Sequence, residues 1–386
     1  MRIHDAGAGG DGSISDTYDY EELPQHQDRK DLDAGALFVL KSKGRTWGRY
    51  YVGPIQLVVC YGAVVGNTLL GGECLKAIYL LSVPDGSMKL YEFVMIFGSM
   101  MLILAQFPSF HSLRYINLAS LVLCLAYSAC AATGSIYIGN SSNGAEKDYS
   151  LVGDTESRVF GMFNAIAIIA TSFGNGIIPE IQATLAPPVK GKMFKGLCLC
   201  YAIVLVTFFS VAISGYWAFG NQADALILSN FVVDGRALMP KWFVFMTNMF
   251  TILQLSAVAV VYCQPTNEAL ERAFADPMSG ELSLRNIVPR VISRSLVVIA
   301  AITLAAMLPF FGDINSFVGA FGFIPLDFIL PAVFFNLTFK PSKRSPIFWV
   351  NITIAVIFSI LGVIASIAAV RQIALDAETY KLFADV

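Results

Sequence analysis

Charged residues are scarce in this chain of 386 residues. They make up 14% of it, whereas a soluble globular protein carries about 25%. Hydrophobic residues make up 56% and fall into long uninterrupted runs. The scarcity of charge excludes an ordinary soluble domain, and the apolar runs indicate a membrane protein with several spans. The net charge of -2 gives no sign of a nucleic-acid partner.

Residues that hold metals or form disulfides are also few. The three histidines are scattered, and the seven cysteines stand in apolar runs without a paired spacing. We expect the cysteines to be buried as small hydrophobes. The run GAGGDG at residues 7–12 fits a dinucleotide fingerprint by letter only, because no strand precedes it and no helix follows it. No nucleophile–base pair stands out either, so we expect no metal, no cofactor and no enzymatic activity.

The chain divides into a tail and one polytopic domain. Residues 1–44 are polar, acidic and glycine-rich, which predicts a disordered cytosolic tail without the apolar segment of a signal peptide. Residues 45–386 contain nine apolar runs near the ~20 residues that a bilayer requires. The predicted fold class is therefore all-α integral membrane, with spans at 52–81, 92–107, 115–138, 158–185, 193–219, 242–263, 291–311, 314–337 and 347–370.

Lysine and arginine in the loops predict the orientation, because short cytosolic loops are enriched in both. The richer set of loops lies before the first span and after the second, fourth, sixth and eighth. This pattern puts the N-terminus in the cytosol and the C-terminus outside. Asn140 begins an Asn-Ser-Ser glycosylation sequon on the outer side, and we expect it to carry a glycan. Asn336 begins a second sequon, but it faces the cytosol and is expected to stay bare.

The fourth predicted span contains an unusual run, TSFGNGIIPEIQAT, at residues 171–184. Lipid cannot satisfy free backbone groups, so a broken helix survives at membrane depth only inside protein or along a cavity. Transporters build substrate sites from such half-helix ends. We predict a break at Gly174–Gly176 with Pro179 in the first turn of the second half-helix, where free N–H groups favour a carboxylate. A glycine-packed kink is the alternative. The expected substrate contacts are Ser172, Phe173, Gly174, Asn175, Gly176 and Ile177.

Polar side chains in other spans extend this hypothesis. Tyr61, Asn67 and Gln254 are expected to point polar groups into a substrate cavity, although most such groups only join helices. Ionisable groups at membrane depth are rarer and indicate function. We assign Glu180 and Asp327 to proton coupling, because a carboxyl in a low dielectric binds a proton more readily. Glu180 has the alternative role of capping its half-helix dipole.

Three further runs carry a resemblance: WGRYYVGPIQ at 47–56, LGGECLK at 70–76 and QFPSFHSLRYIN at 106–117. With the broken span, they make the chain resemble the plant γ-aminobutyrate transporters of the amino acid/auxin permease family over residues 31–386. The resemblance implies eleven spans, ten of them in two inverted five-helix repeats. It also implies proton-coupled uptake of a small amino acid, with γ-aminobutyrate favoured, at the plasma membrane. The implied partners are substrate, protons and the bilayer.

The resemblance is interrupted at one place. Residues 33–44 look like the stretch before the family's first span, and residues 45–47 look like the stretch before its third. The first two spans are absent, so about nine remain, and half of the usual site is missing. We expect the chain to transport poorly or not at all, with unsatisfied backbone groups at the break. Two alternatives stay open: an influx carrier for an auxin-like carboxylate, and a truncated product that does not transport but binds or regulates a full-length relative.

Overall fold

The computed structural model describes residues 48–83, 86–106, 114–141, 147–151, 153–183, 189–233, 235–274 and 283–379, and the predicted disordered tail at 1–44 lies outside them. Nearly all of the described chain is helical. Seven of its helices are long and apolar enough to cross a membrane, by length and composition. The predicted class, an all-α integral membrane protein, is confirmed.

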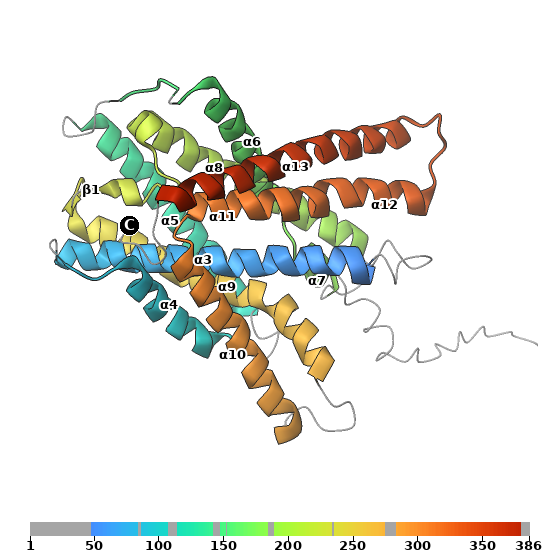
Figure 1. Cartoon of the computed structure of the whole chain (residues 1–386), viewed down its shortest axis with the longest axis horizontal. Coiled ribbons are helices and arrows are strands. Elements are labelled where there is room, and N and C mark those ends of the chain that lie inside the picture. The colour runs from blue at the N-terminus through green and yellow to red at the C-terminus, as the bar shows by residue number, and fades with distance from the viewer. Residues whose placement is uncertain are drawn as a thin grey trace, which may run out of the picture.

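The helices follow one another along the chain (Figure 1). One two-stranded antiparallel hairpin, which pairs β1 with β2, lies in the connection between α8 and α9. The elements are η2 (Gly48–Val52), α3 (Gly53–Ser82), α4 (Leu90–Leu104), α5 (Arg114–Asn140), α6 (Thr155–Phe173), α7 (Ile178–Ala183), α8 (Val189–Phe219), η3 (Gly220–Gln222), η4 (Ser229–Phe231), β1 (Val232–Val233), β2 (Arg236–Ala237), α9 (Lys241–Phe274), α10 (Leu284–Met307), α11 (Phe311–Val318), η5 (Gly319–Ile329), α12 (Leu330–Phe339) and α13 (Pro346–Thr379).

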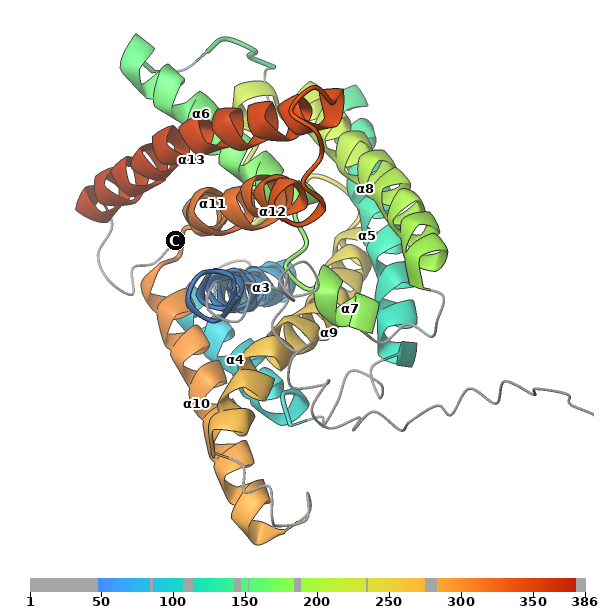
Figure 2. The same cartoon turned by 90° about the vertical axis from the view of Figure 1, so that its right-hand side faces the viewer.

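Helix α3 occupies the centre of the bundle, with α4, α9, α10 and α11 around it (Figure 2). The apolar windows of α3 and α9 are 61% buried, whereas the window of α8 is 6% buried. Small residues allow the central packing. A Cβ at Gly62 would meet Val318, and a Cβ at Gly66 would lie 3.5 Å from the Phe311 ring, so this face of α3 packs against α11.

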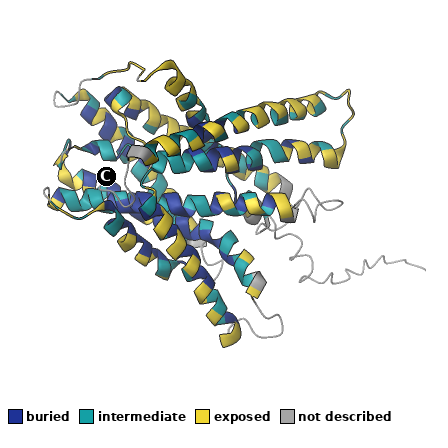
Figure 3. Ribbon diagram, viewed as in Figure 1, coloured by how far each residue is buried: buried dark blue, intermediate teal, exposed yellow. Residues whose placement is uncertain are grey.

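The outer helices expose apolar side chains. Figure 3 shows α8 and α13 exposed along much of their length. Phe208 and Phe209 in α8 and Ile360 and Val363 in α13 are each about half exposed or more, which is the arrangement expected where a helix faces acyl chains. The buried core therefore lies around α3 and α9, and the rim of the bundle faces lipid.

Several helices depart from the predicted boundaries. Helix α9 continues past the predicted end at Cys263, through Pro265, to Phe274, and α10 covers 284–307 where 291–311 was expected. The reason is that the prediction ended each span with its apolar run, whereas backbone hydrogen bonds extend a helix into polar sequence. The predicted spans at 92–107 and 158–185 correspond to shorter helices, α4 and the α6–α7 pair.

One buried arginine connects three helices. Arg294 in α10 is 1% exposed, and its Nε lies 2.6 Å from Glu271 Oε1 in α9. Its Nη1 donates a 3.0 Å hydrogen bond to Ala105 O at the end of α4. Arg290 Nε lies 3.3 Å from the other oxygen of Glu271. Because a buried charge is stable only when it is paired and hydrogen-bonded, this cluster fixes α4, α9 and α10 relative to one another.

Arg294→Met should lower the stability of the purified protein markedly. The substitution removes one partner of a buried ion pair and leaves Ala105 O without its donor, a loss of about 3 kcal/mol. The midpoint of thermal unfolding in detergent measures this loss of stability. Arg344→Met, in the exposed loop before α13, is the control and should leave the midpoint unchanged. Equal midpoints for both variants would contradict the stabilising role of the cluster.

The connection between α5 and α6 is held against the end of α8. Asn221 Nδ2 donates to Asp148 Oδ2 at 3.0 Å, and Ser150 donates to the same carboxylate from both its N–H and its hydroxyl. The Ser150 and Asn221 donors hold the pKa of Asp148 below its usual value. Lys147 Nζ lies 4.0 Å from the Trp217 ring centroid, a cation–π contact. The described part of this connection is thus tied to α8 next to Asn140.

Candidate functional site

The break predicted in the fourth span is present. Helix α6 ends at Phe173 and α7 begins at Ile178. Gly174 leaves the helix in an extended conformation, with φ -74° and ψ 151°. The turn that follows is closed locally, because Ile177 N donates to Asn175 Oδ1 at 3.3 Å and Ile178 N donates to Asn175 O at 3.2 Å. An asparagine that hydrogen-bonds the backbone two residues on is a common turn former.

Two groups at the break have partners from distant parts of the chain. Asn175 N donates to Asp327 Oδ2 in η5 at 3.0 Å. Gly176 O accepts from Gln56 Nε2 in α3 at 2.8 Å. The expectation that the break would leave its backbone groups unsatisfied is therefore wrong for these two groups. The reason is that α3 and η5, both of which the sequence does contain, reach the break from two sides.

Close packing sets the position of η5 along α6. Ser316 donates to Asn164 Oδ1 at 2.9 Å in the buried interface. A Cβ at Gly319 would meet the backbone of Ala167. The contacts advance together along both helices, so α6 and the α11–η5 segment run side by side in the same direction. This register brings Asp327 level with Asn175.

The other wall of the site comes from α3, which runs in the opposite direction. A Cβ at Gly322 in η5 would meet Val59, and a Cβ at Gly176 would lie 2.9 Å from Val59 Cγ1. Gln56 and Val59 are three residues apart and share one face of α3. The broken segment is thus enclosed between α3 and η5, with Gln56 as the polar contact and Val59 as the steric one.

Gly174 is required for space. Its φ of -74° suits any residue, so the conformational freedom of glycine does not explain it. A Cβ there would meet Phe323 and would lie 2.7 Å from Asp327 Oδ2 and 2.8 Å from Ala170 O. Any larger residue at 174 therefore displaces the carboxylate from Asn175.

Asp327 lies in a π-helical segment, half-buried, between the two halves of the span that runs from Phe311 to Phe339. Leu330 N donates to Pro325 O, the i→i+5 bond of such a helix. Among the residues that the structure describes, no lysine or arginine pairs with Asp327. The phenols of Tyr201 in α8 and Tyr262 in α9 lie within its electrostatic range. π-Helical turns are frequent at functional sites.

The structure brings together only part of the predicted site. Asn175, Gly176 and Asp327 meet, and Ile177 is 6% exposed in the adjoining core. Ser172 donates its hydroxyl to Ile168 O within α6, and Phe173 ends that helix. None of the described hydrogen bonds joins the break to the three polar residues predicted to complete the cavity, Tyr61, Asn67 and Gln254.

Glu180 has a backbone position in α7, and its side chain lies outside what the structure describes. Its predicted role in proton coupling therefore stays a prediction. Gln56 was missed, although the sequence held a signal: a glutamine in an apolar run, two residues after Pro54.

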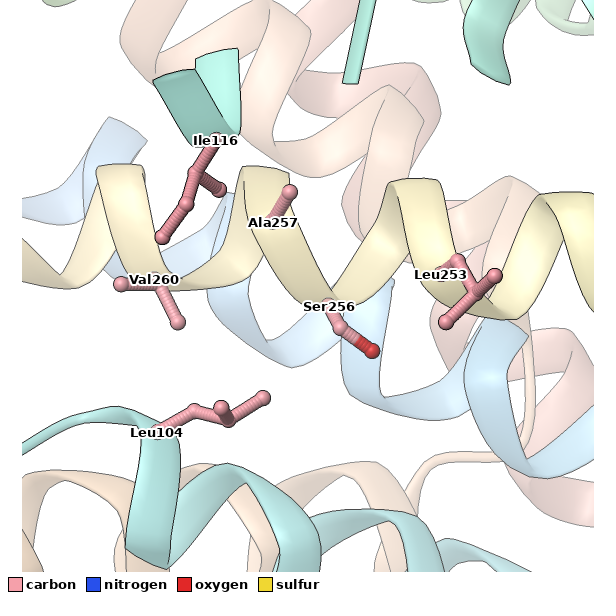
Figure 4. A pocket seen from close by; sticks show the side chains of 6 residues that line it. All are labelled: Leu104, Ile116, Leu253, Ser256, Ala257 and Val260. Carbon is pink, nitrogen blue, oxygen red and sulfur yellow. The ribbon is translucent and has the colours of Figure 1, made fainter. Parts of the chain in front are cut away.

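A cavity of about 180 Å³ lies elsewhere, between α9, the end of α4 and the start of α5 (Figure 4). Its lining is almost wholly apolar, and the hydroxyl of Ser256 donates to Ile252 O at 2.7 Å. Its described lining has no charged side chain to pair with a carboxylate or an ammonium group. Over the described part of the chain, no three or more His, Cys, Asp and Glu side chains gather as they would around a metal ion.

Comparison with known proteins identifies the family. The family described as transmembrane amino acid transporter protein matches residues 13–373. The chain belongs to this family. It is 67% identical over 342 residues to GABA transporter 1 of Arabidopsis thaliana, an alignment that covers 88% of this chain and 76% of that protein. It is 31% identical over 350 residues to lysine histidine transporter-like 6 of the same plant, with 88% and 76% covered.

A third relative, lysine histidine transporter-like 1 of Arabidopsis thaliana, is 29% identical over 349 residues, with 88% of this chain and 74% of that protein covered. The expected membership of the amino acid/auxin permease family is confirmed, as is the expectation of a transporter rather than an enzyme. Discontinuous helices at membrane depth are common in transporters.

Proposed function

We propose that this chain is a carrier for a small amino acid, γ-aminobutyrate in the first place, coupled to protons, and that the α6–α7 break is its substrate site. The observation that supports the proposal is the hydrogen bond from Asn175 N to Asp327 Oδ2. The Asp327 carboxylate already accepts the Asn175 N–H, which is the donor that a substrate carboxylate would use. The 67% identity to a GABA transporter supports the choice of substrate.

The proposed coupling follows from competition for one donor. While Asp327 is ionised, its carboxylate accepts the Asn175 N–H in a charge-assisted bond, roughly twice as strong as a neutral one. When a proton binds Asp327, that bond weakens and the negative charge disappears. The substrate carboxylate then takes the Asn175 N–H in its place. Proton and substrate therefore bind together, and acid on the outer side promotes uptake.

Uptake in transporter-deficient cells tests the proposal. We expect a version with the two family spans restored between residues 44 and 45 to accumulate γ-aminobutyrate, and to do so more strongly at acid external pH. We expect the 386-residue chain without these spans to accumulate far less. An indole carboxylate added as competitor tests the auxin-like alternative. Absence of pH-dependent amino-acid uptake by the restored version would overturn the proposal. Equal uptake by both versions would show that the two spans are dispensable.

We propose the plasma membrane as the location, with the N-terminus in the cytosol and the C-terminus outside. The loop charges support this orientation, which puts the α5–α6 connection outside. Asn140 ends α5, is exposed, and donates its side-chain amide to Ile136 O at 3.0 Å. Asn336 instead donates to Phe348 O and accepts from Asn351, so its amide is used within the fold.

Asn140→Gln should remove all N-linked glycan from the protein made in plant cells. The chain has three sequons, at Asn140, Asn336 and Asn351. The proposed orientation exposes only Asn140 to the glycosylating compartment, because Asn336 and Asn351 meet at the cytosolic side. A gel shift on glycosidase treatment measures it, and Asn336→Gln, the control, should leave that shift intact. A shift that survives in Asn140→Gln would invert the orientation.

A further inference from the structure

We propose that Gln56 is a positioning residue of the substrate site and sets the direction of the Gly176–Ile177 peptide. The inference rests on the proposed function, because it takes the broken segment as the place where substrate binds. The inference adds a third element, beside α6–α7 and η5, to the site.

The contact itself is well defined. Gln56 is 5% exposed, and its Nε2 reaches Gly176 O at 2.8 Å across 120 residues of sequence. It lies in the first turn of α3, two residues after Pro54. Val59, one turn further on, closes the space beside Gly176. The glutamine therefore approaches the break from a fixed direction, on a central helix that is largely buried.

Peptide geometry explains what this bond does. In a planar trans peptide, the C=O and the following N–H point in opposite directions. Holding Gly176 O toward α3 turns Ile177 N–H away from α3, where it meets Asn175 Oδ1 at 3.3 Å. Asn175 in turn presents its own N–H to Asp327. Gln56 thus acts on the donor that we assign to the substrate through the Gly176–Ile177 peptide and the Asn175 side chain.

The contact with Gly176 O requires a hydrogen-bond donor at the end of a side chain as long as glutamine. Gln56→Met keeps the length of the side chain and loses the donor. Gln56→Glu is isosteric, but while the glutamate is ionised it has no donor and its oxygens repel Gly176 O. Once it is protonated, its O–H can donate to Gly176 O again. Asp327 bonds the break directly, and the phenols of Tyr201 and Tyr262 and the thiols of Cys60 and Cys200 lie around it. All of these groups are common to every variant.

Hydrogen exchange of the full chain in lipid nanodiscs tests the inference without substrate. In Gln56→Met, amides across residues 174–178 should exchange about fivefold faster, the factor for one lost hydrogen bond. In Gln56→Glu the same increase should appear at about pH 8 and diminish at about pH 5, where a glutamate begins to take up protons. Each rate is divided by the rate of the same amides in Gln222→Glu at the same pH, since Gln222→Glu makes the same Gln→Glu change at an exposed position at the end of η3.

Unchanged exchange in Gln56→Met, or an increase in Gln56→Glu that ignores pH, would overturn the positioning role. A merely structural glutamine would raise exchange along all of α3 and would not recover on acidification. Hydrogen exchange is measured without a ligand, so its result can contradict the positioning role without contradicting the proposed function, and the reverse. If exchange behaves as expected and γ-aminobutyrate binding of the parent chain is absent, the positioning role stands and the substrate assignment falls.

Discussion

Asp327→Asn should abolish the pH dependence of γ-aminobutyrate binding and uptake. Asparagine keeps the shape and still accepts the Asn175 N–H, but it carries no proton. One proton per substrate supplies about 1.4 kcal/mol for each pH unit across the membrane, a tenfold accumulation, and the variant should lose it and only equilibrate substrate. Because a neutral bond replaces a charge-assisted one, a difference of about 1 kcal/mol, its affinity at alkaline pH should rise roughly fivefold.

Asp224→Asn is the matched control, an exposed carboxyl in the connection between α8 and α9. It should keep the parental pH profile. Full pH dependence in Asp327→Asn would show that the proton binds elsewhere, and Glu180→Gln would then be the next variant to measure. These profiles are best recorded in the version with the two spans restored, where uptake is expected to be robust.

Gly174→Val should reduce γ-aminobutyrate affinity more than any other substitution at the break. The added side chain meets Phe323 and Ala170 O and fills the space beside the Asn175 N–H, where the substrate carboxylate has to bind. Forcing bulk into a packed site costs about 1–3 kcal/mol, which corresponds to a loss of roughly 5- to 150-fold. Gly176→Val should have a smaller effect, because its close contact is the side chain of Val59, at 2.9 Å. Equilibrium binding to the purified chain measures both.

Gly161→Val provides the control on the same helix. A Cβ at Gly161 meets nothing within 4 Å, so the variant should bind like the parent protein. If Gly174→Val and Gly161→Val bind equally well, the break is a packing kink and not a substrate site, which is the alternative that the sequence left open.

The location of the break was predictable because its causes are local. A Gly-Asn-Gly run cannot continue a helix as well as its neighbours do, and Pro179 fits the start of the next one. The class of fold was predictable for a similar reason, since the length and composition of an apolar run decide whether it spans a bilayer. The role of Gly174 was only half predicted: the structure shows that it provides space rather than backbone freedom.

The partners of the break were not predictable, because they depend on tertiary register. Asp327 stood out as a rare carboxyl, but a regular 3.6-residue period does not give the direction of a side chain in the π-helical segment Gly319–Ile329. Gln56 looked like many other polar residues in a span. Tyr61 was chosen for its polarity, yet it packs against the core cluster that contains Cys263. Which face of a helix meets the break depends on the helices packed around it, and the sequence alone does not give their positions.

The absence of two spans, which the resemblance implies, affects the break less than the sequence predicted. Asn175 N and Gly176 O are satisfied by Asp327 and Gln56, so the broken segment has a defined shape without them. Poor transport by this 386-residue chain stays a prediction, but the reason for expecting it changes. A carrier must close its site on both sides in turn, and the absent helices are the elements that the resemblance assigns to the other half.

Proton uptake on substrate binding tests the central claim most directly. Calorimetric titration of γ-aminobutyrate into the full chain in nanodiscs, repeated in buffers of different ionisation enthalpy, counts the protons bound with each substrate molecule. If Asp327 yields Asn175 N–H to the substrate, about one proton should be taken up at neutral pH, because the carboxylate must be neutralised to release its donor. Asp327→Asn should then bind substrate with no proton uptake. Binding without proton uptake in the parent chain, or the same uptake in Asp327→Asn, would contradict the account.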